Sequence, residues 1–363
     1  MKKNIIILTF LVGLISLALA GSFGKQPKPA IQKGPYLSWD DDPQTTMTVS
    51  WETNIPIAGK LAYGPRGKMN YILRNDQAGT LHHLRIKDLK PDTRYYYQLL
   101  NLSAPVCSFK TAPKEPRDFK FVIYGDTRTF PEQHKKVIAA VTQYNPEFLI
   151  HTGDYIQDGR IWAMWQEFFD ASRPFSSFIP LYTVIGNHER TYDNYVKLFA
   201  LPGNERWYAF DYLNAHFIIL NNEEDYQKGS EQYRWFEAEI KRTRPMYKWL
   251  FVLQHRQTYS SGKRGSDQDI LENLEPLFRK YRPDVVFCGH EHFYERQRRN
   301  GVNYIITGGG GAPLYEVNPG DSTFHAESSL HYCQIEVRDS TAKVRMVRVD
   351  GSSPDSLVLK AAR

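Results

Sequence analysis

Five apolar runs in this 363-residue chain end in the same way, with a residue able to bind a metal placed within a few positions of the end of the run. The clearest lies in residues 284–292, where the apolar run Val285–Cys288 is followed by Gly289 and then by His290 and His292. Such a run predicts a buried strand, and a glycine at its end lets the backbone turn sharply. Polar groups beyond the carboxyl ends of strands in an α/β sheet face the crevice in which ligands bind. The pattern therefore predicts an α/β fold whose strand ends meet at one site.

The remaining four runs precede this one and alternate with helical patterns. They end in Gly125-Asp126, Gly153-Asp154, Gly186-Asn187 and Gln254-His255. Apolar residues at helical spacing predict helices over 131–144, 161–171, 231–242 and 269–280. A hairpin is predicted over 205–222 with its turn near Asn214, and strands are predicted over 302–307, 332–338 and 342–349. This alternation predicts an α/β domain over residues 115–363.

Residues 34–114 carry strand patterns without helical periodicity. Thr46–Trp51 alternates at period two, Gly59 starts a second strand, and Leu89–Tyr97 contains a third. The last resembles the tyrosine corner of fibronectin type III domains, in which the hydroxyl of a strand-start tyrosine, here Tyr95, bonds back to the preceding turn. We therefore predict a small all-β sandwich. The tyrosines of this region would also suit a carbohydrate-binding platform, but aromatic residues at strand spacing more often pack in a core.

Residues 1–20 have the pattern of a cleavable secretory signal. Two lysines precede an apolar run that starts at Ile5 and ends in Ala18–Ala20. The run is shorter than the roughly 20 residues that a membrane-spanning helix needs, and no cysteine follows it to carry a lipid. We expect a linker over 21–33 and a periplasmic or secreted protein that has no membrane anchor once the signal is removed.

Charge and cysteine content exclude two further classes. The net charge of +6 falls to +4 when Lys2 and Lys3 leave with the signal, and the remaining charges are dispersed, so no nucleic-acid partner is expected. Three cysteines, Cys107, Cys288 and Cys333, allow at most one disulfide, so the chain is not a disulfide scaffold. A mature chain of about 340 residues favours two domains.

The residues at the strand ends are mixed oxygen and nitrogen donors. Such a set suits two divalent or trivalent first-row metal ions that share one carboxylate. A single residue of this kind would more often be a cap or a satisfied polar group, but five strand ends in succession disfavour that interpretation. The predicted metal ligands are Asp126, Asp154, Asn187, His255, His290 and His292.

These blocks resemble the calcineurin-like metallophosphoesterases, and within them the purple acid phosphatases. The purple acid phosphatase likeness rests on the preceding β domain, on Gly34-Pro35-Tyr36-Leu37 and on Phe293-Tyr294-Glu295-Arg296. The resemblance implies a two-sheet α/β sandwich for the second domain. It also implies two metal ions, most commonly Fe, Zn or Mn, and attack on phosphorus by a metal-bound hydroxide.

The resemblance further implies a role for each donor. Asp154 bridges the two metals, Asp126 and His292 hold the first, and the second is held by Asn187, His255 and His290. His188 would face the substrate and either bind a phosphate oxygen or protonate the leaving alkoxide. Glu189 would stand behind His188 and fix the tautomer of its ring.

Two positions depart from the family pattern. Arg128 stands where the general family places a histidine, and Gln157 stands where purple acid phosphatases place a metal-binding tyrosine. A guanidinium cannot coordinate a cation, so we expect Arg128 either to bind phosphate oxygens as a catalytic residue or to pair with a nearby carboxylate. Arg256 and Tyr294 flank ligand positions and would shape the pocket or simply pack, and Gly308–Gly311 predicts a turn beside the site.

The sequence thus predicts an exported phosphoesterase that hydrolyses small phosphate monoesters. The same metals would equally serve a phosphodiesterase or a nucleotide hydrolase. A different class of function is a surface-binding protein without catalysis, which the complete donor set disfavours. The oligomeric state stays open.

Overall fold

The computed structural model describes residues 27–66 and 68–361. The predicted signal over residues 1–20 and the first part of the predicted linker lie outside the described residues. Within the described part no helix is long and apolar enough to cross a membrane. The cysteines Cys107, Cys288 and Cys333 are all described, buried and unpaired.

The N-terminal region is all-β, as predicted. Its strands are β1 (Ile31–Ser38), β2 (Met47–Pro65), β3 (Tyr71–Ile86), β4 (Arg94–Leu99) and β5 (Cys107–Lys110). The sequence predicted two strands where β2 is continuous, and it missed β3, whose outer half is exposed. Strand β2 pairs with β1 along its first half and with β4 along its second, so the five strands are one hydrogen-bonded set. The backbone N–H of Lys90 donates to the Tyr95 hydroxyl at 2.9 Å, which confirms the predicted tyrosine corner.

The α/β region contains two sheets. The six-stranded sheet has the order β18-β17-β16-β6-β7-β8, and the seven-stranded sheet has the order β15-β13-β14-β12-β11-β10-β9. The first comprises β6 (Phe119–Tyr124), β7 (Phe148–His151), β8 (Leu181–Thr183), β16 (His331–Val337), β17 (Thr341–Arg348) and β18 (Asp355–Lys360). The second comprises β9 (Tyr208–Tyr212), β10 (Ala215–Ile219), β11 (Trp249–Leu253), β12 (Val285–Cys288), β13 (Tyr294–Arg299), β14 (Val302–Thr307) and β15 (Thr323–Glu327).

Aromatic side chains fill the space between the two sheets. Phe121 of β6 packs edge-on against Phe217 of β10 with ring centroids 5.2 Å apart, and against Phe251 of β11 at 5.7 Å. Phe148 of β7 meets Phe217 in the same way at 5.6 Å. Large aromatic rings bury much apolar area per residue, so this layer is the core that holds the sheets face to face. The predicted two-sheet α/β sandwich is confirmed.

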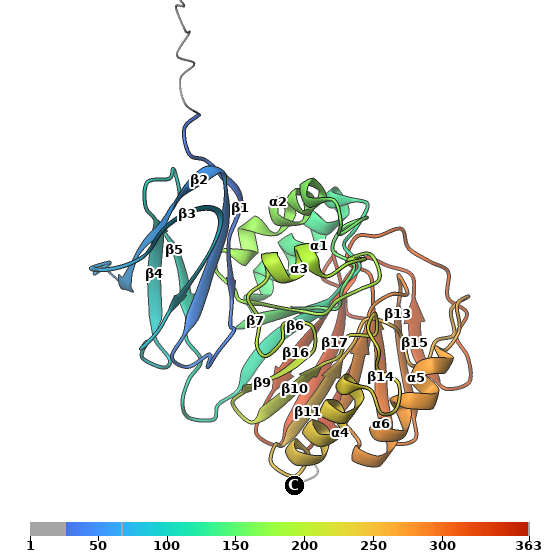
Figure 1. Cartoon of the computed structure of the whole chain (residues 1–363). Helices are drawn as coiled ribbons and strands as arrows, with labels where there is room; N and C mark the ends of the chain where they lie inside the picture. Colours follow the sequence, from blue (N-terminus) through green and yellow to red (C-terminus); the bar gives the residue numbers. More distant parts are fainter. Residues whose placement is uncertain (1–26, 67, 362–363) are drawn as a thin grey trace, which may run out of the picture.

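Helices cover the outer faces of both sheets (Figure 1). Helices α1 (Pro131–Tyr144), α2 (Trp165–Ser176) and α3 (Asp193–Leu198), with the 3-10 turn η1 (Trp162–Met164), lie beside the six-stranded sheet. Helices α4 (Glu231–Thr243), α5 (Gln268–Asn273) and α6 (Glu275–Tyr281) lie beside the other. The helix predicted over 269–280 is two helices, because Pro276 cannot donate the backbone hydrogen bond that would continue α5 and instead starts α6.

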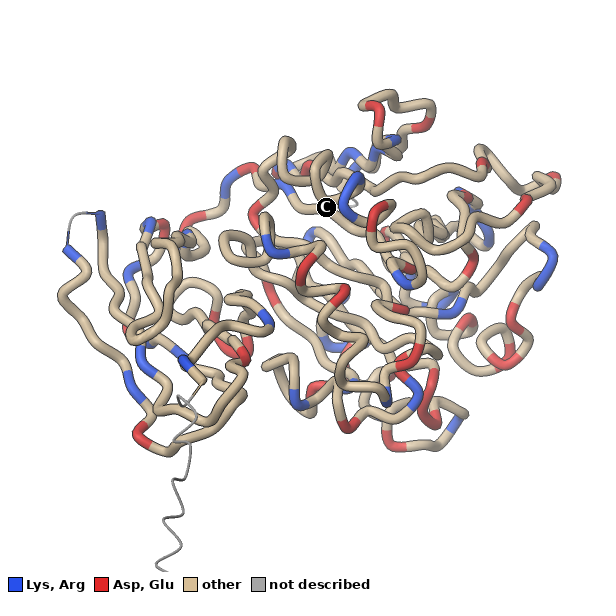
Figure 2. Tube along the Cα trace, turned by 90° about the horizontal axis from the view of Figure 1, so that it is seen from above, with Lys and Arg blue, Asp and Glu red and all other residues tan. Residues whose placement is uncertain are grey.

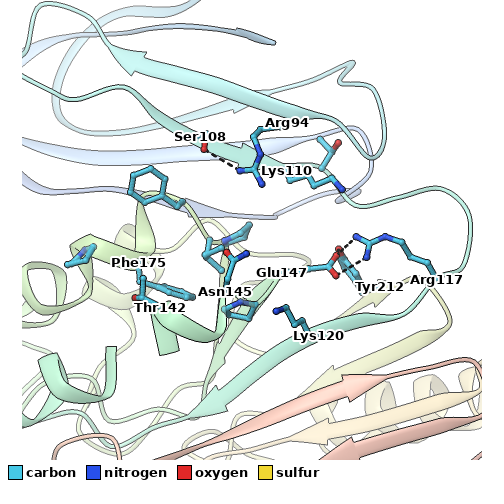
Figure 3. A pocket seen from close by; sticks show the side chains of 16 residues that line it. Arg94, Ser108, Lys110, Arg117, Lys120, Thr142, Asn145, Glu147, Phe175 and Tyr212 are labelled. Carbon is cyan, nitrogen blue, oxygen red and sulfur yellow. Dashed lines mark hydrogen bonds and ion pairs between the residues drawn. The ribbon is translucent and has the colours of Figure 1, made fainter. Parts of the chain in front are cut away.

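The N-terminal sheet packs on α2 and the end of α3. The Tyr36 hydroxyl donates to the carbonyl of Leu198, and the Tyr97 hydroxyl donates to that of Ser177 at 2.8 Å. Below this contact the two regions leave a crevice of about 400 Å³, where Arg117 pairs with Glu147 (Figure 3). Blue and red residues alternate over the whole molecule in Figure 2, so the dispersed charge expected from the sequence is retained in the fold.

Candidate metal centre

The donors predicted from the sequence meet at the carboxyl ends of five strands. Each follows its strand closely: Asp126 after β6, Asp154 after β7, Asn187 after β8, His255 after β11, and His290 and His292 after β12. The strands of each sheet run parallel here, so their ends lie at one edge, and the face-to-face packing of the sheets brings both edges together. All of these donors except Asn187 are buried, and Asn187 is half-buried.

Three of the donors have a left-handed backbone conformation, which residues other than glycine rarely adopt. The φ angles of Asp126, Asp154 and His290 are +60°, +60° and +68°. Left-handed backbone of this kind costs free energy in non-glycine residues and is concentrated at functional sites. Close approach also demands glycine nearby, since a Cβ atom on Gly186 would lie 2.4 Å from the Asp154 carboxylate and one on Gly289 would lie 2.4 Å from that of Asp126. The chain is therefore shaped to bring carboxylates and imidazoles together.

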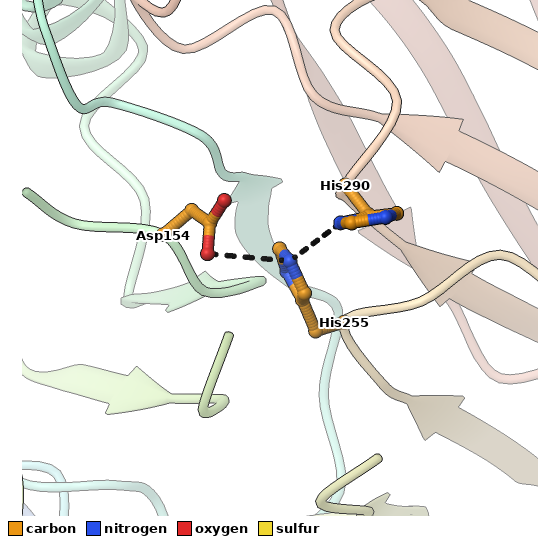
Figure 4. Close-up of side chains that lie close together, drawn as sticks. All are labelled: Asp154, His255 and His290. Atoms are coloured by element: carbon orange, nitrogen blue, oxygen red, sulfur yellow. Dashed lines mark hydrogen bonds and ion pairs between the residues drawn. The ribbon is translucent and has the colours of Figure 1, made fainter. Parts of the chain in front are cut away.

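One cluster of donors converges on the Nε2 atom of His255 (Figure 4). This atom lies 3.1 Å from Nδ1 of His290, 3.1 Å from Oδ1 of Asn187 and 3.3 Å from Oδ1 of Asp154. The other ring nitrogen of His255, Nδ1, donates to the carbonyl of Thr152 at 2.8 Å, so Nε2 presents a lone pair. Four electron-pair donors that point at one another are the arrangement expected around a cation.

A second cluster shares Asp154 and adds Asp126 and His292. Nδ1 of His292 donates to the carbonyl of Pro313 at 2.6 Å, which leaves its Nε2 lone pair 3.6 Å from Oδ1 of Asp126. Both carboxylate oxygens of Asp126 accept the backbone N–H of His290 at 3.0 Å. The two clusters meet through Asp154, whose carboxylate belongs to both.

The residues present fit two metal ions. Burial, together with the neighbouring Asp154 carboxylate, raises the pKa of Asp126 well above its usual range, so two buried carboxylates side by side are unfavourable without a positive charge. Burial lowers the pKa of His292 to about 4, and burial with the neighbouring His255 lowers that of His290 further. Unprotonated imidazoles and carboxylates are the donor set that first-row metals bind.

Arg128 stands beside the first cluster. Its Nη2 lies 3.4 Å from Nε2 of His292, and its Nε lies 3.5 Å from Oδ2 of Asp154. Nη1 donates to the side-chain oxygen of Gln157 at 3.0 Å. The structure therefore shows the carboxylate pairing that was one of the two roles expected for Arg128.

His188 faces the shared carboxylate, but Glu189 does not hold its ring. Nδ1 of His188 donates to the backbone carbonyl of Gln157 at 2.7 Å, and Nε2 lies 3.9 Å from Oδ2 of Asp154. The buried Glu189 carboxylate instead accepts the backbone N–H groups of Asp154, Tyr155 and Gly186, at 3.0, 3.0 and 2.6 Å. The prediction for Glu189 is wrong, because its side chain turns inward to hold the loops after β7 and β8 together.

The sequence also singled out Arg256, Tyr294 and the Gly308–Gly311 segment as residues near the site. Arg256 forms a bidentate pair with Glu223 at 2.7 and 2.9 Å, and the buried Tyr294 hydroxyl donates to Asp355 at 2.8 Å. Both therefore act by packing and pairing. The Gly308–Gly311 segment lies beside the site, as predicted, since a Cβ atom on Gly308 would lie 2.8 Å from the Asp126 carboxylate, but it is irregular backbone that ends in a bend.

Sequence reasoning missed Tyr315, which supports the first cluster. Its ring stacks on the His292 imidazole with centroids 4.1 Å apart and planes 21° apart. No motif marks this tyrosine, which reaches the site only because the loop after β14 returns over the strand ends. A stacked ring of this kind fixes the plane in which His292 offers its lone pair.

Two protein families match the chain. The family described as calcineurin-like phosphoesterase matches residues 119–294, and the N-terminal domain of purple acid phosphatases matches residues 33–111. Probable purple acid phosphatase 20 of Arabidopsis thaliana is 28% identical over 391 residues and covers 91% of each protein. Purple acid phosphatase 1 of Ipomoea batatas is 29% identical over 314 residues, covering 76% of this chain and 64% of the relative.

Solved structures support the fold. A purple acid phosphatase isolated from yellow lupin (Lupinus luteus) seeds superposes with a TM-score of 0.77 at 22% identity, covering 90% of this chain and 74% of that one. The structure of PhoD gives a TM-score of 0.64 at 11% identity, covering 90% and 88%. At these identities the likeness extends to the architecture: an all-β region followed by a two-sheet α/β region.

Proposed function

Because this chain is a calcineurin-like metallophosphoesterase with a purple acid phosphatase N-terminal domain, and therefore a phosphoester hydrolase, we propose that it hydrolyses phosphate monoesters at a two-metal site. The observation that carries this proposal is the pair of buried donor clusters that share Asp154, with His188 beside them. The first metal would be held by Asp126, Asp154 and His292. The second would be held by Asp154, Asn187, His255 and His290.

When bound, the metal ions would lower the pKa of a water molecule and neutralise the negative charge on the phosphoryl oxygens. Iron, zinc and manganese all suit a donor set of imidazole, carboxylate and amide oxygen. The protein contributes fixed ligand directions through the Thr152 and Pro313 carbonyls, each of which accepts the ring N–H of a ligand histidine. Neither ring can then rotate its lone pair away from the site.

His188 is the group that we assign to proton transfer. Its Nδ1–H is committed to the Gln157 carbonyl, so Nε2 is the atom that faces the shared Asp154 and the substrate space. From that position Nε2 can hold a proton near a phosphate oxygen or pass one to the leaving alkoxide. Arg128, whose Nε approaches the same Asp154 oxygen as His188 does, would donate from its guanidinium to the phosphoryl oxygens.

A substrate panel tests the proposal. Protein loaded with Mn, Fe or Zn is assayed with a chromogenic monoester and the matching diester, before and after chelation. We expect monoester hydrolysis that disappears with the metal, because the bound metal ions would activate the attacking water. Preference for the diester would assign the protein to the phosphodiesterases, and a phosphoenzyme trapped from the active protein would overturn the mechanism.

A substitution at His188 tests its role separately. His188→Ala should lower turnover by about 10² to 10⁴-fold, the range of general acid-base residues, with the metal content unchanged. His325→Ala is the matched control, since His325 pairs with Glu327 on β15 and belongs to neither cluster. Loss of a metal from His188→Ala would make His188 a ligand instead.

We also propose export and a domain division. Residues 1–20 would be removed as a secretory signal, 21–33 would form a linker, 34–114 the β domain and 115–363 the catalytic domain. Export would make the product periplasmic or secreted. N-terminal sequencing of the mature protein tests this proposal, and the expected first residue is Gly21.

A further inference from the structure

Arg264 lies at the rim of the metal centre on a loop that is fixed at several points. The backbone N–H and hydroxyl of Ser261 donate to the buried Glu295 carboxylate at 2.9 and 2.6 Å, and Gly262 forms an isolated β-bridge with Val317. On the other side of Arg264, the Gln257 amide donates to the Gly265 carbonyl at 2.8 Å. The backbone that carries Arg264 is thus tied to the strand and to the loop that follow the metal ligands.

A ring contact connects Arg264 to the metal centre. Its Nη2 lies 3.3 Å from the Tyr315 hydroxyl, and its Cζ lies 5.4 Å from the centroid of the Tyr315 ring. The same ring stacks on His292 at 4.1 Å. The separation between Arg264 Cζ and the centre of the His292 ring is therefore at most the sum of the Cζ–Tyr315 and Tyr315–His292 distances. A small substrate can span this separation.

The charge of Arg264 is less neutralised than that of Arg128 or Arg256. Arg256 is held by Glu223 in a bidentate pair, and Arg128 is largely covered and lies against Asp154. Arg264 has one carboxylate within 4.0 Å among the described residues, the buried Glu291, at 3.9 Å and so beyond hydrogen-bond distance. Its side chain is 48% exposed. An arginine that is fixed in place, exposed and incompletely paired is suited to bind an anion from solvent.

We propose that Arg264 is a specificity residue that binds a second anionic group of the substrate. The inference rests on the proposed phosphomonoesterase function and names its substrate class: monoesters whose alcohol carries a carboxylate or a further phosphate. The phosphoryl group itself is placed at the shared Asp154, so any second anion of a monoester belongs to the leaving alcohol. Arg264 meets that group across the Tyr315 ring.

A matched pair of substrates tests this assignment. Phenyl phosphate and 4-carboxyphenyl phosphate differ in one anionic group. We expect Arg264→Gln to lower kcat/KM for the carboxylated ester by about tenfold and to leave kcat/KM for phenyl phosphate unchanged. Tenfold is the lower end of the range for a hydrogen bond to a charged group, because Arg264 is half-exposed and solvent screens its charge. Lys263→Gln removes the same charge from the neighbouring exposed residue and should change neither substrate. An equal loss for both esters, or the same loss in Lys263→Gln, would overturn the proposal.

A binding measurement separates this proposal from the proposed function. Calorimetric titration of the metal-loaded protein with phenylphosphonate and 4-carboxyphenylphosphonate needs no hydrolysis. Wild type should bind the carboxylated compound more tightly, and Arg264→Gln should abolish the difference. If the protein binds both compounds with this difference but hydrolyses no ester, the proposed function fails and the assignment of Arg264 stands. If both bind equally to wild type, the assignment fails whatever the activity.

Discussion

The two halves of the candidate metal centre share Asp154 and differ in what faces their remaining donors. In the second half, His290 and Asn187 converge on Nε2 of His255, and among the described residues no Lys or Arg donates a hydrogen bond to this atom. In the first half, the Arg128 guanidinium stands 3.4 Å from Nε2 of His292 and 3.5 Å from Asp154. Within the described part of the chain, the donors of the second half therefore lack a cationic side chain where they converge, whereas those of the first half already have the Arg128 guanidinium beside them.

The difference indicates that one residue, Arg128, makes the two halves unequal in their affinity for a metal ion. A metal ion and Arg128 compete for the same lone pairs on His292 and Asp154, and like charges at such distances repel strongly away from bulk water. The first metal should therefore bind more weakly than the second. Once a phosphate oxygen arrives, Arg128 can donate to it and leave the metal donors free, which couples the first metal to substrate.

The largest effect is expected at the residue common to both halves. Asp154→Asn should remove nearly all activity, more than about 10³-fold, and at least one metal per chain, because each half loses a charged donor. Asp158→Asn is the control, since Asp158 pairs with Arg160 outside both clusters. Metal per chain is measured by elemental analysis. Full activity with one metal would show that the halves do not share Asp154.

A smaller effect is expected from the carboxylate beneath the shared residue. Glu189→Gln keeps the size of the side chain but sets an amide NH₂ against backbone donors that now bind a carboxylate. An unmatched buried donor costs about 1–3 kcal/mol, so the free energy of unfolding should fall by that amount. Denaturant unfolding measures the loss. Glu132→Gln, at an exposed position on α1, is the control and should change stability little. An unchanged stability in Glu189→Gln would show that Glu189 does not hold the loops.

The sequence could assign these residues to one place because strand ends impose order on them, and the structure brings the six residues together there. An apolar run followed by glycine and Asp126 or Asp154 has only one place in a parallel sheet, so residues far apart in the chain could be assigned to one edge. The alternation of helices with strands followed from a second local pattern, apolar residues at helical spacing. The tyrosine corner at Tyr95 was accessible for a similar reason, because the motif is local.

Long-range side-chain partners escaped prediction because no local pattern encodes them. Glu189 was assigned to the His188 ring from adjacency, yet its carboxylate reaches back to the loop after β7. Tyr315 reaches His292 from a loop without a motif, and β3 was missed because its outer half is exposed and lacks apolar alternation. In each case the partner is set by how the loops return over the sheet, which depends on the whole fold.

The contrast between the halves is tested by exchanging the fixed cation for a ligand. Arg128→His should tighten the weaker metal site by about tenfold, because an imidazole adds a donor where a charge repelled the metal, and it should raise KM. Calorimetric metal titration of wild type should give two unequal affinities, with the weaker one tightened by phosphate. Arg160→His, at an exposed position, is the control. Two equal affinities that Arg128→His leaves unchanged would show that the guanidinium does not distinguish the halves.

The last and smallest expected effect concerns colour: the iron-loaded protein should not be purple. This observation tests the first half of the candidate metal centre alone. The family resemblance attributes the purple band to charge transfer from a tyrosine phenolate to ferric iron, and Gln157 stands at that position. Tyr155 cannot replace it, since its buried hydroxyl donates to the Val184 carbonyl at 3.2 Å and its ring stacks on His151. Iron-loaded wild type should therefore show no such band. Gln157→Tyr should restore it, because position 157 adjoins Arg128 and the first cluster. A purple wild-type protein would mean that another phenolate reaches the first metal.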